Sequence, residues 1–318
     1  MPPALLFPIQ PTYPDQVIPF GELVMNGLAG RLWLGQSFAV ESHQMIAYLV
    51  GRGIKVPTGL SVTLMPLRHP MEAAAQARSL ALLTGRPVVA GYGAATPELV
   101  QSLRGTPYRK PATAAAGYAQ TVRDMLNGVI SGHDGEARGG LPKMKHAPVE
   151  VGLGVLRPRM ARAAGRVADV AVTWMTPPGY VRDTLIPALA EGATGRASVP
   201  RVATVVHVAL AHPSRDPVKL AHNGAGRHLT TPHYTDMLRR AGVPADPADP
   251  RAGAKALVEA GVYVYGTPEE VVRRLRDYRD AGVDEIILNT VGVGLTEGLK
   301  AAAADAEQIL TAMADADE

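Results

Sequence analysis

Short apolar, β-branched runs alternate along the chain with longer segments of helical periodicity. Eight runs have the length and composition of buried strands: Ala4–Ile9, Arg31–Leu34, Lys55–Met65, Pro87–Tyr92, Val149–Leu153, Ala168–Thr173, Arg201–Leu210 and Glu285–Asn289. Helical patterns lie at Gln44–Arg52, Met71–Thr84, Thr113–Asn127, Arg159–Gly165, Gly179–Glu191 and Pro268–Ala281. This alternation is typical of parallel βα units whose strands are covered on both faces. Eight such strands in residues 1–318 predict a single domain of the α/β class, a (β/α)8 TIM barrel.

The last predicted helix has clear start and stop signals. Thr267 is followed by Pro268 and, at the third helical position, by Glu270, which is the pattern of a capping box. Gly282 supplies the left-handed residue that ends such a helix. The strand that follows at once reads as the last strand of the barrel.

Two segments do not fit the alternation. Residues 211–262 carry six prolines among Asp and His residues, which predicts an insertion after strand seven that lies as a lid over the barrel mouth. Gly128–Pro148, rich in Gly, Lys and His, predicts a second loop.

Composition excludes several classes of protein. Apolar residues make up 47% of the chain and charged residues 19%, so a large core can form. A net charge of +3 is too small for a typical nucleic-acid partner, and the absence of cysteine excludes disulfides, thiolate catalysis and iron–sulfur clusters. The N-terminal residues lack the charges of a signal peptide, and no apolar stretch reaches the ~18 residues of a membrane span. We therefore expect a cytoplasmic protein without a membrane partner.

Two glycine-containing turns are candidate ligand sites. Gly91-Tyr92-Gly93 ends a predicted strand, where glycines let backbone amides approach an anionic or planar ligand; a plain tight turn is the alternative. Gly152–Gly154 is followed by Val155, Leu156, Arg157, Pro158 and Arg159, which place a helix N-terminus beside two guanidinium groups. That turn fits a phosphate or carboxylate, with a solvated arginine face as the alternative.

Other chemistries lack their signatures. No histidine pair has metal-ligand spacing with acidic support, so no metal site is predicted, and no Gly-x-Ser-x-Gly nucleophile elbow is present. Trp174, at the end of a predicted strand, is either a core residue or a wall of an apolar pocket.

Several of these segments, in order over nearly the whole chain, resemble the bacterial luciferase-like superfamily, in particular its branch that uses the deazaflavin coenzyme F420. The matching stretches are Arg31–Leu34, Gly59–Val62 through Pro70, Arg86–Gly93, Val149–Gly154, Ala164–Asp169 and Tyr265–Asp284. The resemblance implies a (β/α)8 barrel with an insertion after strand seven and a flavin or deazaflavin ring in the barrel mouth. It also implies a strand-three bulge with a non-prolyl cis peptide at Ser61–Val62. The cofactor contacts that follow from it are Gln36, Ser61, Val62, Gly91, Tyr92, Gly93, Val155, Leu156, Arg157, Arg159 and Trp174.

One departure from the family pattern bears on the direction of the reaction. Many F420-dependent dehydrogenases of this family carry Asp-His where this chain has Gln36-Ser37, so the general base for oxidising an alcohol is missing. This favours reduction of an activated C=C or C=N bond by the reduced cofactor, with Tyr13, Ser37 or Tyr92 as weak candidates for the proton donor. The substrate is then a small molecule or a modified peptide that contains a dehydroamino acid. The alternatives are a reduced-FMN monooxygenase and a non-catalytic flavin- or deazaflavin-binding protein, and we expect a homodimer.

Overall fold

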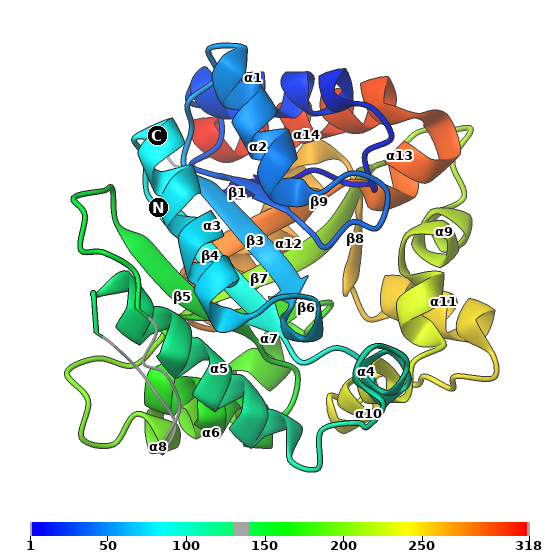
Figure 1. The fold of residues 1–318 in the computed structure, drawn as a ribbon. Coiled ribbons are helices and arrows are strands. Elements are labelled where there is room, and N and C mark those ends of the chain that lie inside the picture. Colours follow the sequence, from blue (N-terminus) through cyan, green and yellow to red (C-terminus); the bar gives the residue numbers. More distant parts are fainter. Residues whose placement is uncertain (1, 130–139, 317–318) are drawn as a thin grey trace.

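The computed structural model describes residues 2–129 and 140–316. Its strands are β1 (Ala4–Leu6), β2 (Leu32–Leu34), β3 (Thr58–Leu64), β4 (Val88–Gly93), β5 (Val149–Gly154), β6 (Val170–Trp174), β7 (Arg201–Leu210), β8 (Tyr263–Gly266) and β9 (Glu285–Asn289). Every pairing between them is parallel. Strands β1 to β7 follow in order, and β9 closes the ring between β7 and β1. The predicted (β/α)8 TIM barrel is therefore confirmed (Figure 1).

Helices cover the outside of the ring (Figure 1). They are η1 (Pro14–Val17), α1 (Ile18–Met25), α2 (Ser42–Gly51), η2 (Met65–Leu67), α3 (Pro70–Thr84), α4 (Pro97–Arg104), α5 (Pro111–Leu126), α6 (Pro158–Val167), α7 (Pro178–Tyr180), the π-helix η3 (Val181–Leu185), α8 (Ile186–Gly192), α9 (Pro217–Leu229), α10 (Pro232–Arg240), α11 (Pro250–Glu259), α12 (Pro268–Asp280), α13 (Val291–Glu297) and α14 (Leu299–Asp315). The predicted capping box of α12 is present. Thr267 Oγ1 accepts the Glu270 amide, Glu270 Oε2 accepts the Thr267 amide, and Gly282 has φ +88°.

The predicted insertion after β7 is helical. It forms the helices α9, α10 and α11, two of which stand beside β8 at one side of the barrel (Figure 1). Its last part leads into β8, a strand that the sequence pattern did not reveal. His207 of β7 pairs with Asn289 of β9 and also with Tyr263 of β8, so β8 extends the sheet beyond the end of β6. Residues 130–139 of the second predicted loop lie outside the described residues.

The core has two layers because strand residues alternate between the barrel interior and the helices. The larger cluster of buried apolar side chains fills the space between strands and helices. The interior holds a smaller apolar cluster: Ala4, Leu6, Trp33, Val89, Val170, Val172, Ala203, Val205 and Ile287, with the partly exposed Val62 and Trp174 packed against it.

A buried ionic cluster lies among the N-terminal parts of the strands. Glu285 Oε1 accepts from Arg31 Nε at 3.1 Å and from Trp33 Nε1 at 2.8 Å. Its Oε2 accepts from Arg201 Nη1 at 2.9 Å, and Arg201 also binds Glu150 through two hydrogen bonds. Only 1% of the Glu285 side chain is exposed, so these partners compensate a fully buried charge. The cluster joins β2, β5, β7 and β9 across the floor of the barrel.

Candidate functional site

Strand β3 contains a bulge near its C-terminal end. Its pairing with β4 has Leu60 opposite Ala90 and then Thr63 opposite Tyr92, so β3 carries one residue more than its partner over this stretch. The peptide bond Ser61–Val62 within the bulge is cis, as the resemblance implied.

Glycines of β4 and β5 make room for the bulge. A Cβ atom on Gly91 would lie 2.1 Å from the carbonyl oxygen of Leu60, and one on Gly93 would lie 2.7 Å from Cγ2 of Val62. A Cβ on Gly154 would lie 3.4 Å from the same methyl group. Val62, Gly93 and Gly154 are all partly exposed. The bulge therefore offers one apolar side chain bordered by bare backbone at the C-terminal end of the barrel, where barrel enzymes place their sites.

A cluster of rings lies at the C-terminal ends of β6 and β7. The Trp174 ring centroid is 5.7 Å from that of His207 in β7 and 5.3 Å from that of His228 in α9. Burial lowers the pKa of His207 to about 3 and that of His228 to about 4, so both imidazoles are neutral near pH 7. Trp174 Nε1, both ring nitrogens of His207 and Nδ1 of His228 are buried without a hydrogen-bond partner among the described residues. Trp174, His207 and His228 can therefore form hydrogen bonds to a ligand without carrying a charge.

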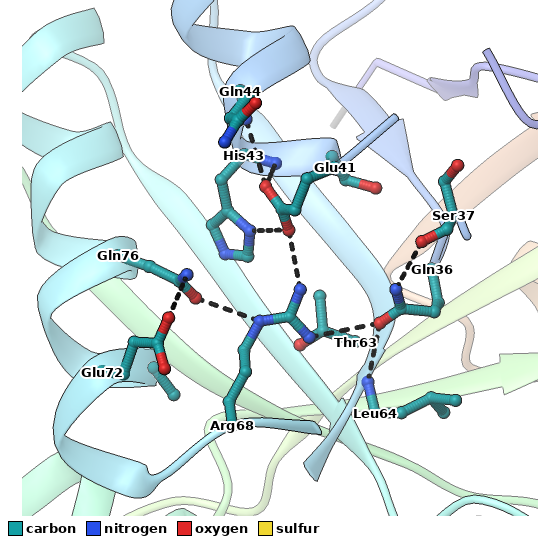
Figure 2. Close-up of polar contacts among 12 residues, drawn as sticks. Gln36, Ser37, Glu41, His43, Gln44, Thr63, Leu64, Arg68, Glu72 and Gln76 are labelled. Atoms are coloured by element: carbon teal, nitrogen blue, oxygen red, sulfur yellow. Dashed lines mark hydrogen bonds and ion pairs between the residues drawn. The ribbon is translucent and has the colours of Figure 1, made fainter. Parts of the chain in front are cut away.

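The residues after β2 belong to a polar network centred on Arg68 (Figure 2). Gln36 Oε1 accepts from the Leu64 amide and from Arg68 Nη1, both at 3.2 Å, and Gln36 Nε2 donates to the Ser37 carbonyl at 2.7 Å. Arg68 Nη2 donates to Glu41 Oε1 at 2.7 Å. Ser37 Oγ accepts two backbone amides of its own loop. The network orients the Gln36 side chain and ties the end of β2 to the end of β3.

Glu41 supplies the negative charge of this network. Burial alone would raise its pKa, but hydrogen bonding and charge from His43, the Gln44 amide and the Arg68 guanidinium outweigh burial and lower the pKa to about 2. The carboxylate also caps α2 by accepting the amides of His43 and Gln44. Glu41 is therefore ionised near neutral pH.

The depressed pKa of Glu41 predicts an acid-sensitive contribution to stability. Since the folded-state pKa lies below the ordinary 4.5, the contribution is complete above about pH 4.5 and is lost as the pH falls toward about 2. We expect Glu41→Gln to remove on the order of 2 kcal/mol of unfolding free energy at pH 6 and much less at pH 3. Urea unfolding at both pH values measures this. Glu72→Gln, which removes an exposed carboxylate that accepts a hydrogen bond from Gln76, is the matched control. An equal loss at both pH values would contradict the assignment.

In the turn between β5 and α6, one backbone amide donates a hydrogen bond within the described residues and two others do not. The Val155 amide donates to a β6 carbonyl at 2.8 Å, whereas no described backbone or side-chain acceptor is bonded to the amides of Arg157 and Arg159. Arg157 caps α6 and pairs with Asp236 of α10 at 3.3 Å. Arg159 is exposed, and its guanidinium has no partner within the described ranges. The two free amides and the Arg159 guanidinium remain open to an anion.

The three proton-donor candidates occupy different surroundings. Tyr92 is 2% exposed and faces the helices, where its hydroxyl donates to the Ala73 carbonyl at 3.4 Å and its ring packs on Tyr118. Burial raises its pKa far above the usual range. Ser37 is buried in its own loop, and Tyr13 is 63% exposed. The backbone of Tyr92 lies beside the bulge, whereas its hydroxyl group lies among the helices. The location of this hydroxyl does not favour Tyr92 as the proton donor.

The described residues contain no group of three or more His, Asp or Glu side chains arranged to hold a metal ion. None of their helices combines the length and apolar character needed to cross a membrane.

A family model described as luciferase-like monooxygenase matches residues 29–285. The chain belongs to this family. The match covers the bulged strand, both glycine turns and the helices after β7, so the family resemblance of the sequence is confirmed. The family consists of oxidoreductases and monooxygenases, and this level of function holds for the chain.

Several solved structures share the fold at low sequence identity. The coenzyme F420-dependent tetrahydromethanopterin reductase from Methanopyrus kandleri is 16% identical, with a TM-score of 0.72, over 98% of this chain and 99% of that one. An F420-dependent secondary alcohol dehydrogenase in complex with an F420–acetone adduct gives the same values. The oxygenating constituent of 3,6-diketocamphane monooxygenase from Pseudomonas putida, in complex with FMN, is 16% identical, with a TM-score of 0.68, over 99% of this chain and 98% of that one. These likenesses establish the fold alone.

Sequence reasoning missed three residues of the site. Arg68 entered only as part of the family-like stretch that ends at Pro70, although it links the ends of two strands. His207 lies in the predicted strand Arg201–Leu210 and was given no role; its place at an inward, alternating position of β7 was the available signal. His228 comes from the insertion, and nothing local in the sequence indicates that it contacts Trp174.

Proposed function

We propose that this protein is an F420-dependent reductase that transfers hydride to an activated C=C or C=N bond. The observation that carries the proposal is the bulge at Ser61–Val62 beside the glycines of β4 and β5, at the C-terminal end of the barrel. Backbone on one side and the Val62 side chain on the other suit a flat ring that lies against the bulge. The unpartnered Ser61 hydroxyl and Trp174 indole Nε1 are polar atoms that such a ring can satisfy. Bound there, reduced coenzyme F420 supplies a hydride.

The β5–α6 turn supports a cofactor with an anionic tail. The free amides of Arg157 and Arg159 and the unpaired Arg159 guanidinium would hold phosphate or carboxylate groups. Gly91 and Gly93 admit the bulge against which the ring would lie, and the partly exposed Leu156 would provide apolar contact. Val155, also predicted as a contact, is 1% exposed and packs in the core. The deazaflavin carries more negative charge on its tail than FMN does, which favours F420 over FMN.

The direction of the reaction follows from the groups beside the bulge. Gln36 and Ser37 are held by the Arg68 network and supply no general base. His207 and His228 are neutral and can orient a substrate carbonyl or imine by hydrogen bonding without carrying charge. Reduction of a conjugated bond requires such orientation and one proton. We propose that the substrate is a small molecule or a modified peptide with a dehydroamino acid, and that the enzyme acts in the cytoplasm as a homodimer.

Titration of the protein with reduced F420, FMN and NADPH, read as dissociation constants, tests the cofactor assignment. We expect F420 to bind most tightly and the bound cofactor to be oxidised by substrate without oxygen. Tighter binding of FMN together with product formed only in the presence of oxygen would favour the alternative, a reduced-FMN monooxygenase, in keeping with the family description and the FMN-bound relative. Tight F420 binding without turnover on any conjugated substrate would indicate a non-catalytic binding protein.

Arg159→Ala is expected to weaken F420 binding by about 1–3 kcal/mol, because a charged hydrogen bond to the tail is lost. Fluorescence titration of the deazaflavin measures the change. Arg166→Ala is the control, since Arg166 is exposed near the opposite end of the same helix. An unchanged dissociation constant for Arg159→Ala would remove this residue from the site.

A further inference from the structure

A cavity of about 490 Å³ lies outside the barrel, between barrel helices and the insertion. Its walls come from α7 and η3 after β6, from the C-terminal ends of α10 and α11, and from α12. None of its lining residues belongs to the bulge, the glycine turns or the ring cluster described above. The volume falls within the range of small-molecule sites.

The wall formed by η3 is a π-helix. Residues Val181–Leu185 form this wider turn between α7 and α8, and Asp183 and Thr184 line the cavity. Isolated π-helical turns interrupt the regular hydrogen-bond ladder and occur frequently at functional sites. The π-helical turn therefore forms part of the cavity wall.

Two buried tyrosines in the lining have unused hydrogen-bonding capacity. Tyr180 is 5% exposed and Tyr278 is 1% exposed, and the hydroxyl group of each is buried without a hydrogen-bond partner among the described residues. Buried hydroxyl groups are nearly always hydrogen-bonded in folded proteins. Two orphaned phenols on one cavity indicate that a ligand supplies the missing partner.

The cavity also has two arginines with free donors. Arg240 uses Nε to bind Asp236 at 3.0 Å, which leaves its terminal nitrogens available. Arg274 makes only a long contact of 3.9 Å, with Asp277. The guanidinium groups and the two phenols together present four donor groups from three separate elements.

The acidic side chains of the lining are partly used already. Both carboxylate oxygens of Asp183 accept from Arg182, at 2.7 and 2.9 Å. Asp277, the other carboxylate, faces Arg274 at 3.9 Å. Asp183 is therefore occupied by Arg182, and Asp277 is the lining carboxylate left open. The open donors of Arg240, Arg274 and the two tyrosines outnumber it, which favours an oxygen anion as the ligand.

We propose that this cavity is a second ligand site, which binds the carboxylate or phosphate group of a small molecule. Arg240 and Arg274 provide charge-assisted hydrogen bonds to the anion, and the Tyr180 and Tyr278 hydroxyls bind its remaining oxygens. Because α10 and α11 form part of the walls, an occupied site joins the insertion to the barrel.

Inorganic phosphate is the probe, observed by 31P NMR line broadening at constant ionic strength, with succinate as a competitor. We expect saturable binding that weakens about tenfold in Arg240→Gln and in Arg274→Gln. Arg273→Gln is the matched control, because Arg273 is the exposed neighbour on α12 and does not line the cavity. If succinate displaces the bound phosphate, the site accepts carboxylates. If the line broadening of phosphate persists in the presence of succinate, the site prefers phosphate.

Two further variants keep the test specific. The double variant Tyr180→Phe/Tyr278→Phe retains both rings and is expected to weaken phosphate binding roughly fivefold. Arg159→Gln removes the guanidinium at the proposed cofactor turn, so it reports any phosphate bound at that turn. It is expected to leave the part of the signal that depends on Arg240 and Arg274 unchanged. Absence of saturable binding, equal loss in Arg273→Gln and Arg274→Gln, or loss only in Arg159→Gln would each overturn the proposal. The last of these results would leave the proposed reductase function intact.

Discussion

Gly91→Ala is expected to lower the free energy of unfolding by about 3 kcal/mol and to abolish measurable cofactor binding. The added Cβ would lie 2.1 Å from the Leu60 carbonyl oxygen, and this atom belongs to the backbone of the bulge. Relief of the overlap requires β3 or β4 to move, which displaces Val62 from its position beside Gly93. Urea unfolding and F420 titration measure the two effects.

Gly117→Ala is the control for this substitution. Gly117 lies within α5, is exposed, and its Cβ would meet no atom within 4 Å. Alanine is the better helix former, so this variant should be as stable as the wild type or up to about 1 kcal/mol more stable. If Gly91→Ala unfolds at the same urea concentration as Gly117→Ala, close packing around the bulge is not what this site requires.

Glu285→Gln is expected to destabilise the protein by about 3–5 kcal/mol, because it leaves buried positive charge without its counter-charge. Arg31 has no other carboxylate partner among the described residues, and only 10% of its side chain is exposed. Arg201 keeps its two hydrogen bonds to Glu150. Urea unfolding near pH 7 measures the loss.

Glu150→Gln tests the same cluster from its partly exposed side. Glu150 is 30% exposed, and Arg201 would retain Glu285, so a loss of about 1 kcal/mol or less is expected. Similar losses for Glu150→Gln and Glu285→Gln would mean that burial of Glu285 does not dominate the energetics of the barrel floor.

Local patterns predicted most of the barrel because each element carries its own signal. The strands are apolar runs that become buried, and the Thr267–Glu270 capping box forms as its spacing requires. The bulge was predicted from family resemblance, and the glycines at 91 and 93 acquire their meaning only beside Val62.

The errors lie where tertiary contacts override local pattern. Strand β8 is only four residues long, and it forms because the second half of β7 offers it a partner. The prolines after β7 interrupted the expected strand–helix alternation and no helix was predicted there, yet each of α9, α10 and α11 has a proline at its first position, where the missing N–H costs nothing. Tyr92 was considered as a proton donor, but the alternation of strand residues turns its side chain toward α3.

The amino-acid sequence by itself determined the α/β class, the order of the strands and the family, because periodicity, caps and glycine turns are short-range signals. Only the tertiary structure decided which polar groups meet. Arg68 contacts Gln36 and Glu41, which lie 32 and 27 positions away in the sequence. His228 contacts Trp174 from within the insertion. Such pairs depend on the closure of the ring, which brings distant segments together without leaving a pattern in either segment alone.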